Sequence, residues 1–310
     1  MDGLILVHKP KDITSHDVVS CIKKILRVEK AGHYGTLDPL ATGLILVAVG
    51  KATRLFRFFL NTNKTYEGKI RLGLSTDTFD AYGQPASEES KDYPDCKTLL
   101  ENMKAFEGDI DQISPPISAK KYRGKPLYEL ARQRKEFKLK TNRVTVHFFR
   151  LKKYNPPFVD FVSKCSSGTY IRSLAHDLGQ SLGCGAHLIQ LMRTEIGDFS
   201  LNDSYTLDKI EKLARQGEIR KFFLPLESLL PEFPCVVIKD AASSQVMNGS
   251  EVYPDSILKT HPSRPAESHT DKGERSIFKI FDTNGKLLAF AKKNAKKQSL
   301  HPFLVIHSRE

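Results

Sequence analysis

Gly32-His33-Tyr34-Gly35-Thr36-Leu37-Asp38-Pro39-Leu40-Ala41-Thr42-Gly43 is the stretch on which the prediction of the fold depends. Its three glycines permit tight turns and a close approach of the backbone to a ligand. Asp38 lies between Leu37 and Pro39-Leu40, so its carboxylate has apolar neighbours. Local sequence leaves two interpretations open. Asp38 is either a helix N-cap with Pro39 at the first helical position, or a reactive group in a ligand-binding loop.

The segments around this loop carry clear strand and helix patterns. Residues 3–7 form a short apolar run that predicts a strand, and Ser15–Leu26 has apolar side chains at helical spacing, with Thr14 or Ser15 as N-cap. Further strands are predicted at 44–49, Lys64–Leu72, 143–154 and Phe158–Cys165, and further helices at 51–60, 95–106, 126–134 and 169–182.

The C-terminal part has a different pattern. Pro231 and Pro234 bracket a plausible linker, and residues 276–282 and 286–293 flank Thr283-Asn284-Gly285, a strong hairpin signal. Residues 254–275 are polar and rich in Pro, Ser and His, which favours a mobile loop. We therefore expect two domains, 1–231 and a small β-rich module at 232–310.

The charge of the chain is concentrated in one segment. The 310 residues carry a formal charge of +12, which indicates a polyanionic partner such as nucleic acid. Residues 119–153 contain thirteen Lys or Arg against two acids. Such a patch binds phosphates with strong salt dependence, although a solvated charged face is the alternative. Aromatic residues interspersed in the segment favour RNA: Tyr122, Tyr128, Phe137, Phe148 and Phe149.

Several classes of protein are excluded by missing motifs. The five cysteines are scattered without a C-x-x-C pair, which predicts reduced thiols and neither a zinc site nor a disulfide framework. There is no P-loop, H-E-x-x-H or G-x-S-x-G motif, and no complete dinucleotide fingerprint. The start of the chain does not resemble a signal peptide, and the longest apolar run, 44–49, is too short for a membrane span. We expect a cytoplasmic protein without a metal or cofactor.

The loop 32–43 resembles the G-H-x-G-T-L-D-P-x-A-x-G motif of the TruB family of tRNA pseudouridine synthases, with all fixed positions present. One position departs from the family's pattern: residue 192 is Met, where the family usually has an arginine. Other segments match the family's motifs in the same order: Lys9-Pro10 with Ser15; Lys64-Thr65-Tyr66; Arg71-Leu72-Gly73 with Asp77-Thr78 and Asp80; Pro115-Pro116 to Arg132; Ser167-Gly168-Thr169-Tyr170-Ile171-Arg172; and 183–191.

The resemblance implies an α+β fold with a mainly antiparallel central sheet and, more loosely, a C-terminal RNA-binding PUA-like module. It implies isomerisation of uridine 55 in the TΨC loop of tRNA by a stand-alone, monomeric enzyme. The reaction breaks the bond from ribose to the base nitrogen, turns the base and rejoins the ribose to carbon-5. Nothing is oxidised, so the absence of cofactor motifs fits.

The resemblance also assigns roles to individual residues. Asp38 is the nucleophile, kept ionised by Arg172 in a charge-assisted pair. Tyr66 stacks on the uracil of the flipped nucleotide and assists removal of the carbon-5 proton, and His33 holds the RNA loop open. The remaining implied residues are Tyr170 and Leu191 in the uridine pocket, and Arg54, Lys121, Arg123, Lys125, Arg132 and Arg193 in contacts with RNA.

Two alternatives to this function remain open. One is a tRNA chaperone that makes the same contacts without chemistry. The other is a guide-RNA-dependent synthase of the dyskerin type, which shares the catalytic motif but needs partner proteins.

Overall fold

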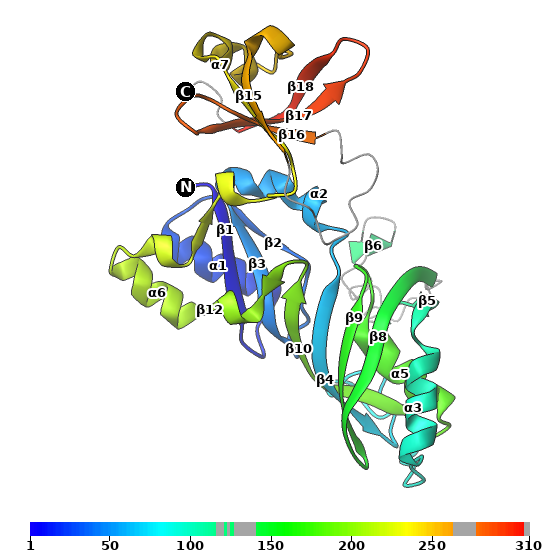
Figure 1. Cartoon of the computed structure of the whole chain (residues 1–310). Helices are drawn as coiled ribbons and strands as arrows, with labels where there is room; N and C mark the ends of the chain where they lie inside the picture. Colours follow the sequence, from blue (N-terminus) through cyan, green and yellow to red (C-terminus); the bar gives the residue numbers. More distant parts are fainter. Residues whose placement is uncertain (116–120, 123–124, 127–140, 263–276, 307–310) are drawn as a thin grey trace.

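The computed structural model describes residues 1–115, 121–122, 125–126, 141–262 and 277–306 (Figure 1). A long sheet runs through the lower part of the view and a smaller sheet lies above it. The main path of the large sheet has the strand order β12-β1-β3-β10-β4-β9-β8-β5. In chain order these strands are β1 (Gly3–Lys9), β3 (Thr42–Val49), β4 (Lys64–Leu72), β5 (Gly108–Ile113), β8 (Thr141–Asn155), β9 (Phe158–Cys165), β10 (Ala186–Ile196) and β12 (Tyr205–Thr206).

The large sheet is mainly antiparallel, as expected. Only two of its pairings are parallel among the described residues, β1 with β12 and β3 with β10. The second of these joins the two halves of the sheet. At this junction a side chain on Gly43 would lie 2.3 Å from the backbone oxygen of Arg193, so only glycine permits the contact. The last glycine of the 32–43 motif is thus a packing requirement.

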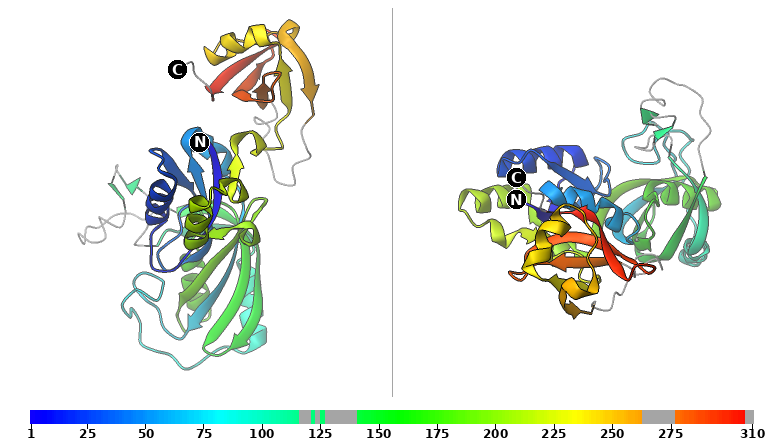
Figure 2. Two further views of the ribbon diagram at one scale, coloured as in Figure 1. Left: turned by 90° about the vertical axis from the view of Figure 1, so that its left-hand side faces the viewer. Right: turned by 90° about the horizontal axis from the view of Figure 1, so that it is seen from above.

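Helices cover the two ends of the large sheet separately (Figures 1 and 2). Helices α1 (Ser15–Leu26) and α6 (Leu207–Arg215) pack on β1 and β3, and α3 (Cys96–Ala105) and α5 (Ile171–Ser181) pack on the other half. Thr14 is the N-cap of α1 and forms a capping box with Asp17, as its position before an apolar helical pattern predicts. The two halves meet between β3, β4 and β10, where the candidate site lies.

The C-terminal sheet has the order β15-β14-β16-β17-β18. Its strands are β14 (Cys235–Ile238), β15 (Ile257–His261), β16 (Ile277–Phe281), β17 (Leu287–Asn294) and β18 (Ser299–Val305), with α7 (Asp240–Met247) on one face. The expected hairpin is present, because β16 pairs with β17 in antiparallel register. The expectation of one loop over 254–275 is wrong in part, since β15 pairs with β14 within that range; residues 263–276 lie outside the described residues.

Aromatic packing joins the two sheets. Phe58, from the short helix α2 (Phe56–Phe59), packs against Phe233 and Phe290 with ring centroids 5.2 and 6.0 Å away. Lys279, on β16, is also buried, and its ammonium donates to the backbone oxygen of Leu229 at 3.0 Å. The helix predicted at 51–60 is instead a 3-10 helix, Gly50–Leu55, followed by the short helix α2. The predicted helix at 126–134 falls mostly outside the described residues.

Candidate active site

The motif loop connects β2 (Ala31–Tyr34) to β3, and no helix follows Asp38. The backbone N–H of Ala41 donates to the oxygen of Asp38 at 3.0 Å, which closes a turn over Pro39 and Leu40. The N-cap interpretation of Asp38 is therefore wrong. Leu37 and Leu40 are each 3% exposed, so the loop is anchored on both sides of an aspartate whose side chain is 40% exposed.

Side chains from β1 and α1 fix the backbone of this loop. The Ser15 hydroxyl accepts from the N–H of Leu37 at 2.8 Å and is 3.0 Å from its carbonyl oxygen. The buried ammonium of Lys9 donates to Pro10 and Ile13 oxygens at 2.8 Å, and it lies 3.4 Å from that of Pro39. These contacts explain why Lys9 and Ser15 accompany the loop in the sequence pattern.

Arg193 occupies a position that the sequence did not predict. It was expected to contact phosphate, but it is 1% exposed and its guanidinium donates to the oxygens of Leu44 at 2.8 Å and Gly35 at 2.9 Å. A buried guanidinium whose N–H groups bind the protein's own carbonyls does not offer them to an RNA backbone. The expectation is therefore corrected: Arg193 supports the loop from below.

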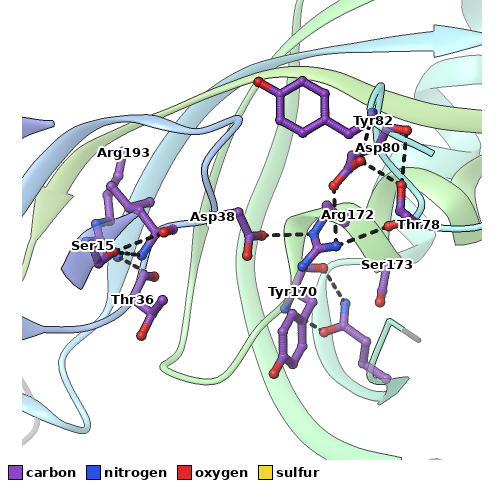
Figure 3. Close-up of polar contacts among 12 residues, drawn as sticks. Ser15, Thr36, Asp38, Thr78, Asp80, Tyr82, Tyr170, Arg172, Ser173 and Arg193 are labelled. Carbon is purple, nitrogen blue, oxygen red and sulfur yellow. Dashed lines mark hydrogen bonds and ion pairs between the residues drawn. The ribbon is translucent and has the colours of Figure 1, made fainter. Parts of the chain in front are cut away.

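An ion pair links the loop to α5 (Figure 3). Arg172, in the first turn of α5, places its Nε 2.9 Å from Oδ2 of Asp38. The arginine side chain is 6% exposed, so water screens the pair less than it would at the surface. This geometry holds one carboxylate oxygen of Asp38 in a fixed position beside the guanidinium.

A second acid completes the arrangement around Arg172. Its Nη1 lies 3.3 Å from Oδ2 of Asp80 and donates to the Thr78 oxygen at 3.2 Å. The Asp80 side chain is 7% exposed and its other oxygen accepts from the Thr78 hydroxyl at 2.7 Å and from the N–H of Tyr82 at 3.0 Å. Asp80 belongs to a segment that matches a family motif, but the sequence alone indicates no role for it.

Packing fixes the turn that carries Asp80. Phe79 has φ +65°, which a bulky residue adopts rarely, and its ring stacks on His176 with centroids 3.8 Å apart. His176 lies one turn after Arg172 on α5. The same helix therefore supplies the guanidinium and holds the turn whose acid binds it.

The other wall of the site is fixed through Tyr170. The Gln112 side chain accepts from the N–H of Tyr170 at 2.7 Å and donates to its oxygen at 2.9 Å. The Ser173 hydroxyl donates to the Ile113 oxygen at 2.8 Å. Strand β5 thus positions the start of α5, a contact that no local sequence signal indicated.

These elements surround a cleft of about 510 Å³. It contains all the residues expected in catalysis and uridine binding: His33, Asp38, Tyr66, Tyr170, Arg172 and Leu191. A larger hollow of about 610 Å³ touches β4, β9 and β10. Its charges include Lys152, which is paired with Glu67 at 2.9 Å, whereas the smaller cleft combines a carboxylate, a guanidinium and aromatic walls. The chemistry therefore points to the smaller cleft.

Burial sets the charge state of the groups that line the cleft. It lowers the pKa of His33 below the usual value, and nearby Arg193 adds to this effect; the imidazole is therefore neutral near pH 7. Burial raises the pKa of the Tyr66 hydroxyl, which keeps it protonated at neutral pH. Burial also lowers the pKa of Lys64 to about 8. Asp38 thus faces a neutral imidazole and phenol, and its direct ion-pair partner is Arg172.

The other residues expected to contact RNA are placed only in part. Arg54 is exposed and donates to the Val305 oxygen at 3.1 Å, so it touches β18 of the C-terminal sheet. Lys121 and Lys125 lie on the short strands β6 (Lys121–Tyr122) and β7 (Lys125–Pro126). Arg123 and Arg132 lie outside the described residues, so their expected role stays a prediction.

The fold and the site together place an ion-paired carboxylate in a cleft with aromatic walls. Similar solved structures extend over nearly the whole chain. One is a chain of an H/ACA RNP bound to a substrate RNA containing 2'-deoxyuridine (28% identity, TM-score 0.71, 99% of this chain and 86% of that chain). Another belongs to a Cbf5-Nop10-Gar1 complex (29% identity, TM-score 0.70, 99% and 85%).

Sequence comparison gives the family. Residues 23–171 match the N-terminal domain of the TruB family of pseudouridylate synthases, and residues 172–231 match the C-terminal domain of tRNA pseudouridylate synthase B. The chain therefore belongs to the TruB family of pseudouridylate synthases.

Two relatives show the extent of the match. The tRNA pseudouridine synthase B of Solibacter usitatus is 40% identical over 262 residues, which cover 84% of this chain and 89% of the relative. That of Bacillus cytotoxicus is 34% identical over 307 residues, with 97% and 95% covered. In the part of the chain that the structure describes, no helix is long and apolar enough to cross a membrane.

Proposed function

We propose that the protein isomerises uridine to pseudouridine in tRNA, at position 55 of the TΨC loop, with Asp38 as the nucleophile. The observation that carries the proposal is the Asp38–Arg172 ion pair of 2.9 Å inside a cleft with His33, Tyr66 and Tyr170 on its walls. A nucleotide swung out of its stack fits such a cleft, because aromatic side chains can take over the lost base stacking.

The reaction needs a nucleophile, a support for the uracil base and a group that positions the nucleophile. The Asp38 carboxylate forms a covalent intermediate with the flipped nucleotide, which divides the reaction into steps. The bond from ribose to the base nitrogen breaks and the turned base joins ribose through carbon-5. Carbon-5 loses its proton, the freed base nitrogen gains one, and Asp38 is released as a carboxylate. Tyr66 supports the uracil and assists the loss of the carbon-5 proton. Arg172 aims the carboxylate through the 2.9 Å ion pair. Asp80, with its side chain 7% exposed, holds Arg172 in turn.

Binding of the tRNA arm would use surfaces outside the cleft. The segment 119–153, with thirteen basic residues against two acids, would grip backbone phosphates, which position RNA without reading sequence. Residues 232–310 would form a PUA-like RNA-binding module, supported by the lysines at the end of β17 and in the turn to β18: Lys292, Lys293, Lys296 and Lys297.

We further propose that the protein acts alone, as a cytoplasmic monomer. The relatives named tRNA pseudouridine synthase B match this chain over 89–95% of their own length. The solved neighbours belong to ribonucleoprotein or multiprotein complexes, which makes the guide-RNA-dependent enzyme the second candidate.

Incubation of the purified protein with unmodified tRNA, followed by mapping of pseudouridine, tests both proposals. We expect product at position 55 in whole tRNA and in the isolated TΨC stem-loop. Product only after addition of partner proteins and guide RNA would overturn the stand-alone mode. Tight binding of tRNA without product in any mixture would favour the chaperone.

A further inference from the structure

Arg193 joins three segments that meet under the cleft. Its Nε donates to Leu44 of β3 at 2.8 Å, its Nη2 to Gly35 at 2.9 Å, and its Nη1 lies 3.5 Å from the oxygen of Thr36. Its own backbone pairs with Gly43 of β3 on one side and with Tyr66 of β4 on the other. The residue is 1% exposed, so the surrounding structure fixes both its backbone and its side chain.

Tyr66 is the neighbour that matters for the chemistry. It is 8% exposed, lies directly opposite Arg193 in the β4–β10 ladder, and lines the same cleft. Directly opposite side chains on an antiparallel pair project from the same face of the sheet. Burial raises the pKa of the Tyr66 hydroxyl, while the charge of Arg193 acts in the opposite direction. Arg193 therefore binds the loop that carries Asp38 and is the cross-strand neighbour of Tyr66.

We propose that Arg193 is a positioning residue that holds Tyr66, its cross-strand neighbour on β4, in register with the loop that carries Asp38. The proposal rests on the proposed function for the reaction that it serves. In this role Arg193 binds carbonyl groups of the protein itself, whereas the sequence predicted a contact with RNA phosphate.

The shape of the guanidinium explains why arginine is needed here. Its planar fork reaches carbonyls in several directions at once, whereas a lysine ammonium is a single point of charge. The nearby lysines already have other partners: Lys64 donates to the oxygen of Thr62 at 2.5 Å and Lys9 to that of Pro10 at 2.8 Å. A lysine at position 193 would keep the charge and lose the fork.

Arg193→Met and Arg193→Lys separate these contributions. We expect Arg193→Met to lower the single-turnover rate at saturating stem-loop about 100-fold, as misplacement of reacting groups by about 1 Å does. The dissociation constant of the stem-loop should change less than threefold (about 0.7 kcal/mol at most). Arg193→Lys should recover part of the rate because it retains the charge. Arg71→Met is the matched control, since Arg71 lies on β4 in a half-exposed pair with Glu89, and its rate should equal that of the wild type.

Titration of Tyr66 gives a readout that does not depend on activity. In protein with 13C-labelled tyrosine, assigned by Tyr66→Phe, the ionisation of Tyr66 should move to higher pH in Arg193→Met, and less so in Arg193→Lys. If Arg193→Met does not fold, the lysine variant still decides the question by this shift. An unmoved titration, or weaker RNA binding with an unchanged rate, would overturn the proposal. Absence of pseudouridine with the wild type would overturn the proposed function alone.

Discussion

The two sheets bury polar groups very differently. The large sheet and its loops enclose four buried charged side chains that bear on the site, Lys9, Asp80, Arg172 and Arg193, together with Lys64 at its edge. In the described part of the C-terminal sheet the buried charged side chain is Lys279, and it donates to the backbone oxygen of Leu229, just before the linker. Apart from the exposed contact of Arg54 with Val305, the buried packing of that sheet on the large sheet is apolar and aromatic.

The difference shows where the chain keeps charged side chains buried although their burial is unfavourable. A buried charge loses several kcal/mol of hydration and needs well-placed partners, whereas buried aromatic surface is favourable without such partners. The catalytic part accepts these buried charges because they orient Asp38 and its loop. The interface to the C-terminal sheet only has to hold two bodies together. Variants in the two regions should therefore separate loss of activity from loss of stability.

Among the variants that compare the two regions, Arg172→Met should have the largest combined effect on activity and stability. It leaves Asp80 buried without its cation, which typically costs about 3–5 kcal/mol of stability, and it removes the partner that aims Asp38. The single-turnover rate of the folded fraction should fall about 10³-fold. Thermal unfolding and rapid-quench pseudouridine assays measure the two losses.

Arg215→Met serves as its control, because Arg215 is 76% exposed in a helical pair with Glu211. It should change neither quantity. The contrast between the two regions would be contradicted by a comparable loss of rate and stability in Arg215→Met. A single-turnover rate of Arg172→Met within tenfold of the wild type would contradict it as well.

A smaller effect should appear in the pH dependence of stability. Burial lowers the pKa of Lys9 to about 8 from 10.5. Below pH 8 both folded and unfolded chains hold this proton; between about pH 8 and 10.5 only the unfolded chain does, so this group makes folding more favourable as pH rises. The stability of the wild type relative to Lys9→Met should therefore increase between pH 7 and 9.5, by about 2 kcal/mol. Urea unfolding at both values tests this, and a constant or shrinking difference would contradict it.

The smallest effect on activity is expected at the interface. Phe290 is fully buried against Phe58 and Phe233, and Phe290→Ala should cost about 3–5 kcal/mol of stability. The rate per folded molecule should stay within about twofold of the wild type, since no catalytic group is touched. Tyr253→Ala, at a side chain that is 49% exposed, should change neither. A large loss of rate in Phe290→Ala would show that the interface controls the cleft.

Much of this architecture was predictable from local patterns. The strands Lys64–Leu72 and Phe158–Cys165 and the helix Ser15–Leu26 have the predicted bounds, because alternation and helical spacing are properties of the segments themselves. The motif likewise brought Asp38 and Arg172 together although 134 residues separate them along the chain.

What sequence reasoning missed depends on long-range contacts. The edge strand Ile257–His261 is mostly exposed and owes its conformation to pairing with β14, so its polar sequence favoured a loop. Arg193 has the sequence character of a phosphate contact and becomes a buried support only because β3, β4 and β10 meet around it. The role of Asp80 likewise appears only when its turn packs on α5.

The central claim is that the Asp38 carboxylate performs the isomerisation in the cleft where Arg172 holds it. Asp38→Asn keeps the size of the side chain and removes its charge, and the most direct measurement is its single-turnover pseudouridine formation beside its affinity for the same stem-loop. We expect product formation to fall by about 10⁴-fold or more, as removal of a nucleophile typically does, with affinity near that of the wild type. Pseudouridine formed at the wild-type rate by this variant would contradict the claim.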